Sequence, residues 1–274
     1  MAANTIHYEI DTHVLSVRER RVDVDASAAE IDQLVTEGYL VREGALAPDQ
    51  LEHLRGALDV LIEREIGHAD LRADRGFGGL FLRHLLDRHE AFHALLRFGP
   101  TLSVARAVLG PLVQIRALSA RVTVGGEPGQ ETQWHVHQQV IPRPLPPFFC
   151  YPHGLDCLFY LDDVTDESGP LCVVPGSHAP GTPGLPDDDF ADKEGQVVLR
   201  PSAGSCAIIH SNLWHRAMAT QPSVVRRRVI ILTYVPTWMR PAPYGAPPDD
   251  GLTRQLLADG DDEVRELLGV GGFT

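Results

Sequence analysis

The second half of the sequence, from Gly110 to Pro236, consists of short strand-like runs separated by turns rich in glycine and proline. The first run, residues 113–124, alternates in character as a strand with one buried face does. Later strand-sized runs lie at 155–161, 171–174, 196–199, 206–210 and 225–235. Many short strands at this spacing are typical of a β-sandwich or barrel. The sequence therefore predicts a mainly β core over residues 111–240.

The residues before Gly110 have helical signals instead. Ser27 and Glu30 have the capping-box spacing of a helix start. A turn and a short strand follow at 37–41, and Pro48 is in a favoured first-turn position for a second helix that Gly67 would end. One buried stripe on this second helix is predicted from Leu51, Leu54, Leu58 and Leu61. Further helices are expected at 82–96, 102–109 and 262–268.

No linker long enough to separate independent domains is visible in the sequence. We therefore expect one domain over residues 1–274, with a helix-rich flank (1–110), the β core (111–240) and a C-terminal extension (241–274). The stretch 142–152 is rich in proline and contains two phenylalanines, and we expect it to shape the entrance to a pocket.

The charge and the hydropathy pattern exclude several classes of protein. The chain has 24 basic and 37 acidic residues, a net charge of −13, whereas nucleic-acid binding needs a basic surface. Its apolar runs are far shorter than the roughly 18 residues that cross a bilayer. The first residues lack the features of a secretory signal, and the four cysteines form no CxxC pair. We expect a cytoplasmic protein with no nucleic-acid or membrane partner.

Three of the 13 histidines stand apart from the rest. His135 and His137 lie two residues apart where strands are expected, so both rings would project from one face. His215 follows an apolar strand much further along the chain. Two close histidines and a distant one match the pattern of a first-row metal site. Because His-X-His pairs also occur on solvent-exposed faces, the spacing alone leaves both interpretations open.

Two longer stretches around these histidines resemble hallmark segments of the phytanoyl-CoA dioxygenase family. They are residues 161–178, which include Asp162-Asp163 and Pro175-Gly176-Ser177-His178, and residues 203–216, which end in Leu213-Trp214-His215-Arg216. The segment 37–41 and the leucine-striped helix after it also look like the N-terminal region of that family. The resemblance covers roughly residues 30–240.

The resemblance implies a fold and an activity. It implies a double-stranded β-helix (jelly-roll) core flanked by helices. It also implies a non-haem Fe(II) oxygenase that uses dioxygen and the co-substrate 2-oxoglutarate. Such an enzyme decarboxylates 2-oxoglutarate and hydroxylates, desaturates or cyclises a small organic substrate.

The metal ligands implied by the resemblance depart from the family at one position. His135 matches the first ligand and His215 the last, but His137 stands where the family has a carboxylate. Three alternatives follow. His137 coordinates iron and forms a three-histidine site, or it turns away and water or substrate takes its place, or the site binds no iron.

A dianionic co-substrate needs a fixed cation, and arginine binds carboxylates bidentately. The family places this arginine on the strand after the last histidine. Counting forward from His215 gives Arg226, whereas aligning backward from Tyr234 gives Arg227. Strand alternation puts Arg226 and Arg228 on one face and Arg227 on the other. We favour Arg227.

Three further residues are candidates for the site. Gln133 and Trp134 adjoin the first ligand and are expected to line the cofactor pocket. Asp156 lies on a neighbouring strand, where it would bind substrate or hold His137. The overall prediction is an Fe(II)- and 2-oxoglutarate-dependent dioxygenase. The alternatives are a three-histidine iron oxygenase that does not use 2-oxoglutarate, and a catalytically inactive jelly-roll binding protein.

Overall fold

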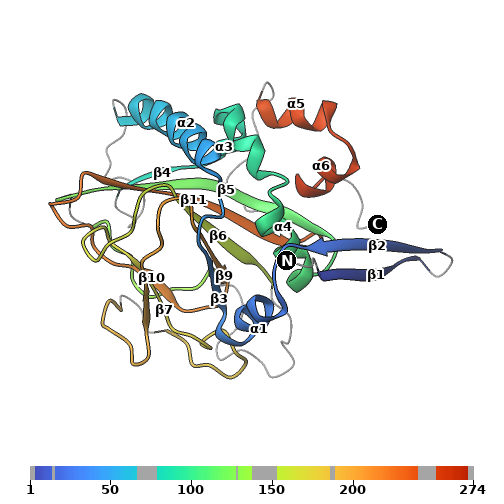
Figure 1. The fold of residues 1–274 in the computed structure, drawn as a ribbon, viewed down its shortest axis with the longest axis horizontal. Coiled ribbons are helices and arrows are strands. Elements are labelled where there is room, and N and C mark those ends of the chain that lie inside the picture. Colours follow the sequence, from blue (N-terminus) through green and yellow to red (C-terminus); the bar gives the residue numbers. More distant parts are fainter. Residues whose placement is uncertain are drawn as a thin grey trace.

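The main element of the computed structural model is a six-stranded antiparallel sheet (Figure 1). The structure describes residues 4–13, 16–66, 79–127, 129–137, 153–185, 189–239 and 251–270. In spatial order the strands of this sheet are β3 (Tyr39–Arg42), β9 (Cys206–His210), β6 (Leu155–Tyr160), β11 (Arg226–Pro236), β5 (Val113–Val124) and β4 (Leu80–Leu82). A smaller antiparallel sheet contains β10 (His215–Ala217), β7 (Leu171–Val173) and β8 (Val197–Leu199).

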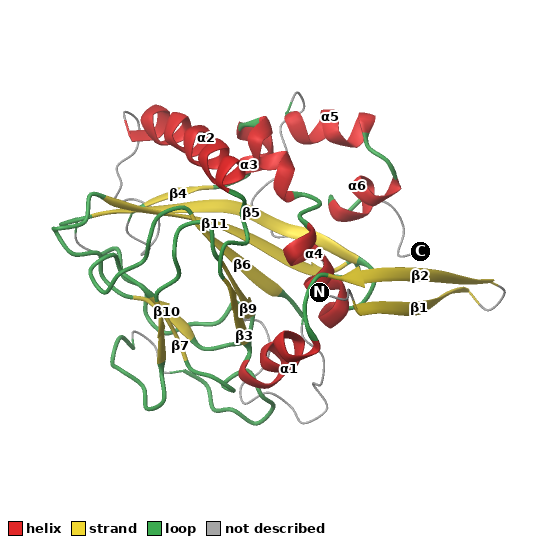
Figure 2. Cartoon of the chain, in the orientation of Figure 1, coloured by secondary structure: helices red, strands yellow, loops and turns green. Residues whose placement is uncertain are grey.

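A shared apolar core lies between the two sheets. Leu158 of β6 and Ile209 of β9 pack in one cluster with Leu171, Val173 and Leu199 of the smaller sheet. Two antiparallel sheets that enclose a common core form the jelly-roll arrangement, which Figure 2 shows from the side. The predicted mainly β fold is confirmed.

Helices cover the outer face of the large sheet (Figure 1). Alternation along β6 explains why, because Cys157 and Phe159 point outward into a second apolar cluster that also contains helical residues. Phe159 packs edge-on against Phe98 at a ring-centroid distance of 5.5 Å. The helices of the fold are α1 (Ala28–Glu37), α2 (Pro48–Ile66), α3 (Leu85–Arg88), the 3-10 helix η1 (Glu90–Leu95), α4 (Gly99–Leu109), α5 (Leu252–Asp259) and α6 (Asp262–Leu267).

Local sequence signals set the start of the first two helices. The backbone N–H of Glu30 donates to Ser27 Oγ at 3.2 Å, and the Ser27 N–H donates to the Glu30 carboxylate at 2.7 Å, so the predicted capping box is present. Helix α2 begins at Pro48 as predicted, and three of its four stripe leucines, Leu54, Leu58 and Leu61, are buried. Gly67, the predicted end of α2, lies outside the described residues, as does the stretch 142–152.

Other local predictions are wrong. The stretch 82–96 is not one helix, because His84 has a φ of +57° and His89 is extended. The His89 ring accepts a hydrogen bond from the Ala91 N–H at 3.1 Å and so starts η1 as a separate element. Residues 135–137 do not form a strand but a single bridge, in which His135 pairs with His215.

The first 110 residues are also less helical than predicted. They contain a hairpin, β1 (Asn4–His13) and β2 (Ser16–Val24), and they supply β3 and β4 to the large sheet. Neither the hairpin, nor β10, nor α5 was expected from apolar periodicity. No helix within the described ranges combines the length and apolar character needed to span a bilayer.

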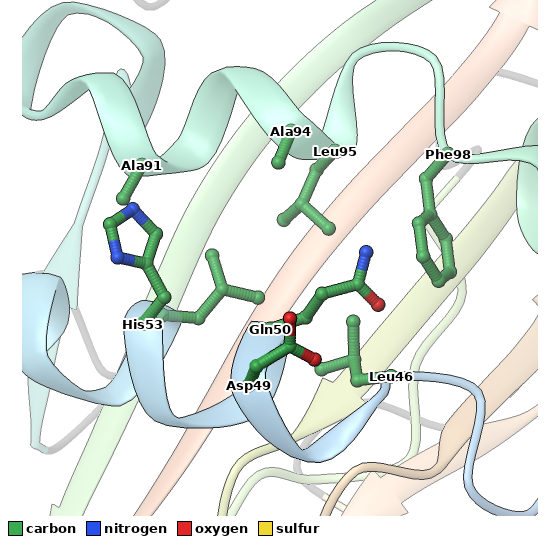
Figure 3. A pocket seen from close by; sticks show the side chains of 9 residues that line it. Leu46, Asp49, Gln50, His53, Ala91, Ala94, Leu95 and Phe98 are labelled. Carbon is green, nitrogen blue, oxygen red and sulfur yellow. The ribbon is translucent and has the colours of Figure 1, made fainter.

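A pocket of about 170 Å³ lies on the helical side of the large sheet (Figure 3). His53 of α2 faces Ala91 of η1 across it, Phe98 lies at one end, and Leu54 also lines it. Phe98 packs on the outward side of β6, whereas Leu158 and Tyr160 belong to the core between the sheets. The large sheet therefore separates this pocket from the inner core.

Candidate metal centre

The three histidines singled out in the sequence meet at one edge of the jelly roll. His135 and His215 exchange backbone hydrogen bonds of 2.9 and 3.2 Å, which sets their rings 4.2 Å apart between centroids. The His137 N–H donates to the Ser211 carbonyl at 2.8 Å, which brings the third ring to the same place. One ring nitrogen from each histidine lies within 4.8 Å of the other two.

Backbone carbonyls fix the tautomer of two of these rings. His135 Nδ1 lies 2.8 Å from the carbonyl oxygen of Gln133, and His215 Nδ1 lies 2.8 Å from that of Leu213. Because a carbonyl oxygen only accepts, each Nδ1 carries the hydrogen and each Nε2 keeps its lone pair. This is the form in which imidazole binds a metal, with the other nitrogen held by an oxygen.

A carboxylate, not a carbonyl, holds the third ring. His137 Nδ1 lies 2.7 Å from Asp156 Oδ2, and His137 Nε2 lies 3.2 Å from His215 Nε2. Asp156 has no solvent exposure and also accepts hydrogen bonds from Thr233 Oγ1 at 2.6 Å and Ser211 Oγ at 3.0 Å. The His137 side chain keeps 32% of its surface exposed, so the cluster is open on this side.

Burial and charge shift the pKa values of the three rings in different directions. Burial lowers the pKa of His135 to about 4 and holds that of His215 well below its usual range, so both rings are neutral at pH 7. Burial would also lower the pKa of His137, but the charge and hydrogen bond of Asp156 outweigh it and raise that pKa. Two neutral imidazoles and a third ring whose Nε2 faces that of His215 fit a first-row transition metal such as iron.

The inner face of the large sheet carries polar residues in rows beside the histidines. In β5, β11 and β6, one row is Ala117, Thr233 and Asp156, and the row two residues along each strand is Ser119, Ile231 and Leu158. The next row is Arg121, Val229 and Tyr160, and after it Thr123 pairs with Arg227. Asp156 and Tyr160 therefore point to the same side of β6 as Arg121 and Arg227 do on their strands.

The arginine triplet divides between the two faces of β11 as alternation predicts. Arg226 and Arg228 both pair with Asp59, at 3.2 and 2.8 Å, and Arg228 also pairs with Asp162. Arg227 is 4% exposed, and no carboxylate of the described residues pairs with it. Of the two arginines considered for the co-substrate, Arg226 is thus neutralised near the surface, whereas Arg227 is buried with no carboxylate partner among the described residues.

Two more polar groups accompany Arg227 in the interior. The Tyr160 hydroxyl is buried and has no hydrogen-bond partner within the described ranges, and the same holds for Arg227 Nε. Burial raises the pKa of Tyr160, so its hydroxyl remains a donor. Burial and the nearby charge of Arg227 lower the pKa of Arg121 to about 10, which leaves Arg121 protonated at neutral pH. Tyr160 and Arg227 together offer donors to an anion.

Sequence reasoning did not identify Tyr160 as a site residue. The only signal in the sequence is that Tyr160 and Asp156 are four residues apart on one predicted strand, so their side chains share a face. Alternation alone does not tell which face of a strand lies inward.

The remaining candidates lie around the first histidine. The Gln133 carbonyl holds the His135 ring. Trp134 is 2% exposed, its Nε1 donates to the Ala191 carbonyl at 2.7 Å, and the Arg216 guanidinium lies over its ring at 5.3 Å. The Trp134 side chain therefore contacts the segment at 189–192, and its expected place in a cofactor pocket remains a prediction.

Comparison with known proteins gives a family and a set of similar folds. The sequence model of the family described as phytanoyl-CoA dioxygenase (PhyH) matches residues 34–228. The fold is similar to HygX from Streptomyces hygroscopicus crystallised with nickel and 2-oxoglutarate, with a TM-score of 0.65 at 17% identity over 79% of this chain and 89% of that one. The HygX structure with iron bound has a TM-score of 0.62 at the same identity and coverage.

A second similar structure is SnoK, described as a non-haem α-ketoglutarate-dependent carbocyclase from nogalamycin biosynthesis. Its TM-score is 0.61 at 18% identity, over 80% of this chain and 88% of that one. No curated protein matches the chain in sequence. At these identities the structural likeness establishes the fold, and the family rests on the sequence match.

Proposed function

The chain belongs to the phytanoyl-CoA dioxygenase (PhyH) family of iron- and 2-oxoglutarate-dependent oxygenases, and we propose that His135, His137 and His215 hold its Fe(II) ion. The observation that carries this assignment is the convergence of three ring nitrogens, each from an imidazole whose Nδ1 is held by an oxygen. A bound iron would activate dioxygen and couple decarboxylation of 2-oxoglutarate to oxidation of a small organic substrate.

The role of the chain in this reaction is to bind and orient. The two backbone hydrogen bonds between His135 and His215 would hold these two ligands in a fixed relative position. Both rings stay neutral well below pH 7, so protons do not compete for their Nε2 atoms near neutrality. A first-row metal held by these three nitrogens would keep further coordination positions for co-substrate and oxygen.

Arg227 is proposed to bind the distal carboxylate of 2-oxoglutarate, with the Tyr160 hydroxyl as a second donor. A buried guanidinium without a carboxylate partner is costly, and an anionic ligand would offset that cost. Arg226 is a poorer candidate because Asp59 already neutralises it.

Hydroxylation is the proposed outcome, and desaturation and ring formation are the alternatives. The proposed location is the cytoplasm, which agrees with three buried, unpaired cysteines, Cys157, Cys172 and Cys206.

The decisive experiment is an anaerobic titration of the protein with Fe(II), followed by addition of 2-oxoglutarate. We expect one iron per chain and a visible charge-transfer band when 2-oxoglutarate is added, and succinate once oxygen is admitted. Iron binding without the band or succinate would favour the oxygenase that does not use 2-oxoglutarate. A protein that binds no iron would be the inactive jelly-roll binding protein.

A further inference from the structure

One of the three histidines differs from the others in what holds its ring. Backbone carbonyls, which are neutral, hold His135 and His215 at 2.8 Å. His137 is held by the carboxylate of Asp156 at 2.7 Å. His137, the ring held by a carboxylate, is also the residue that stands where the family resemblance implies a carboxylate ligand.

We propose that Asp156 supplies its negative charge to the metal through His137, so that the two residues act together as one anionic ligand. The inference rests on the proposed function, since it assigns a further residue to the same centre. Asp156 is in this sense a positioning residue, because it acts on the metal only through the His137 ring.

The hydrogen bonds around Asp156 hold it as a carboxylate. Oδ1 accepts from Thr233 Oγ1 at 2.6 Å, and Oδ2 accepts from Ser211 Oγ at 3.0 Å and from His137 Nδ1 at 2.7 Å. All three partners are donors, which favours the ionised form of a carboxyl group. Thr233 lies directly opposite Asp156 in the pairing of β11 with β6, so the network is built into the sheet.

A buried carboxylate also needs a positive charge nearby. Asp156 has no exposed surface, and no lysine or arginine of the described part of the chain forms an ion pair with it. The cation must therefore come through the His137 ring, either as a proton or as a metal on the far nitrogen. Because His137 Nε2 lies 3.2 Å from His215 Nε2, a metal at this junction would contact both rings.

The charge has a consequence for the metal. A carboxylate that accepts a hydrogen bond from a ligand imidazole makes that ligand more basic and fixes its orientation. Replacing a ligand carboxylate by histidine alone would leave the centre one unit more positive. Asp156 restores the missing negative charge, but it does so from the far side of the His137 ring and not in direct contact with the metal.

The test is anaerobic titration of the whole protein with Co(II), read by visible absorption, alongside Fe(II) affinity. The variant Asp156→Asn keeps the size of the side chain and an oxygen that accepts from His137 Nδ1, but it removes the charge. We expect the metal Kd to rise about ten- to a hundredfold and the Co(II) bands to shift. The matched control is Asp166→Asn, which removes a carboxylate that pairs with Arg200 at the surface and should bind metal as the wild type does.

A second variant tests whether the negative charge can be moved from Asp156 to the ligand position itself. The double variant His137→Asp with Asp156→Asn places a carboxylate directly in the ligand position and leaves no buried charge on β6. We expect its metal affinity to return to within about threefold of the wild type, because the single and double changes are coupled. A double variant that binds as weakly as His137→Ala would overturn the inference.

The remaining outcomes separate this inference from the proposed function. If the wild type binds metal and His215→Ala does not, the metal centre stands. A folded Asp156→Asn protein with wild-type affinity and unchanged Co(II) bands would then overturn the role of Asp156 alone. A wild type that binds neither Co(II) nor Fe(II) would overturn both.

Discussion

Replacement of Tyr160 by phenylalanine should have opposite effects on stability and on co-substrate binding. The Tyr160 side chain is 1% exposed and its hydroxyl has no partner among the described residues. A buried hydroxyl without a hydrogen bond costs about 1–3 kcal/mol of folding free energy. Tyr160→Phe removes only this oxygen and keeps the ring packing. We expect the free energy of unfolding without co-substrate to stay equal or to increase by about 1 kcal/mol.

Binding of 2-oxoglutarate should weaken in the same variant. If the Tyr160 hydroxyl donates to the distal carboxylate beside Arg227, its loss removes a hydrogen bond to a charged group, which is worth about 1.5–3 kcal/mol. At 1.4 kcal/mol for each factor of ten, the Kd of 2-oxoglutarate should rise roughly ten- to 150-fold.

Two measurements on each protein test this prediction, namely urea unfolding of the protein without co-substrate and calorimetric titration of the Fe(II)-loaded protein with 2-oxoglutarate under anaerobic conditions. Tyr8→Phe is the control, because the Tyr8 hydroxyl donates to the Arg106 carbonyl at 2.9 Å. That control should lose stability and keep its affinity for 2-oxoglutarate. A Tyr160→Phe protein that is clearly less stable, or that binds 2-oxoglutarate as the wild type does, would refute the reasoning.

Three further predictions follow from the same geometry. His215→Ala should abolish bound iron and succinate formation by metal analysis and product assay, whereas exposed His53→Ala should change neither. Arg227→Gln should raise the 2-oxoglutarate Kd about ten- to a hundredfold, and Arg226→Gln should leave it nearly unchanged because Asp59 already neutralises that arginine. Glu30→Ala should lower the free energy of unfolding by about 1 kcal/mol at pH 7. Although burial opposes it, the Ser27 hydrogen bonds hold the pKa of Glu30 below its usual value, so urea titrations should show this difference shrinking as the pH falls below about 4.5.

Signals that act within a few residues could be predicted from the sequence. The capping box of Ser27 and Glu30 and the start of α2 at Pro48 depend on local backbone geometry, and both are present in the structure. The strand runs of the second half were found because each is bounded by turn residues.

Elements that depend on distant partners could not be predicted in this way. The segment 82–96 has a helical pattern, but its first residue, Leu82, ends β4, which pairs with β5, and the chain then turns at His84. The β1–β2 hairpin was not predicted, although Ile6, Tyr8 and Ile10 alternate with polar residues along β1, because the charged run in the middle of β2 interrupts the pattern in its partner strand. A pairing between distant strands is a tertiary effect that overrides local propensity.

The three histidines and Arg227 could be named as candidates from the sequence. The residues that they contact could not, because those contacts depend on how the strands pair. Asp156 meets His137 only because β6 pairs with β11 and β9 in the register that sets Asp156 opposite Thr233 and Ile209. A shift by one residue would turn Asp156 outward into the helical layer. For that reason the sequence could offer two roles for Asp156 but could not choose between them.

The same strand connects the two ends of the proposed centre. Asp156 and Tyr160 lie on one face of β6, four residues apart, and at about 3.3 Å per residue their Cα atoms are separated by roughly 13 Å. Asp156 holds the proposed metal ligand His137 at one end, and Tyr160 accompanies Arg227 at the other. Leu158 lies between them on the same face and faces the core between the sheets. We therefore expect a dianion that is bound to the metal at one end and to Arg227 at the other to lie along the face of β6 that carries Leu158, so that a strand of the sheet and not a flexible loop would hold both ends of its site.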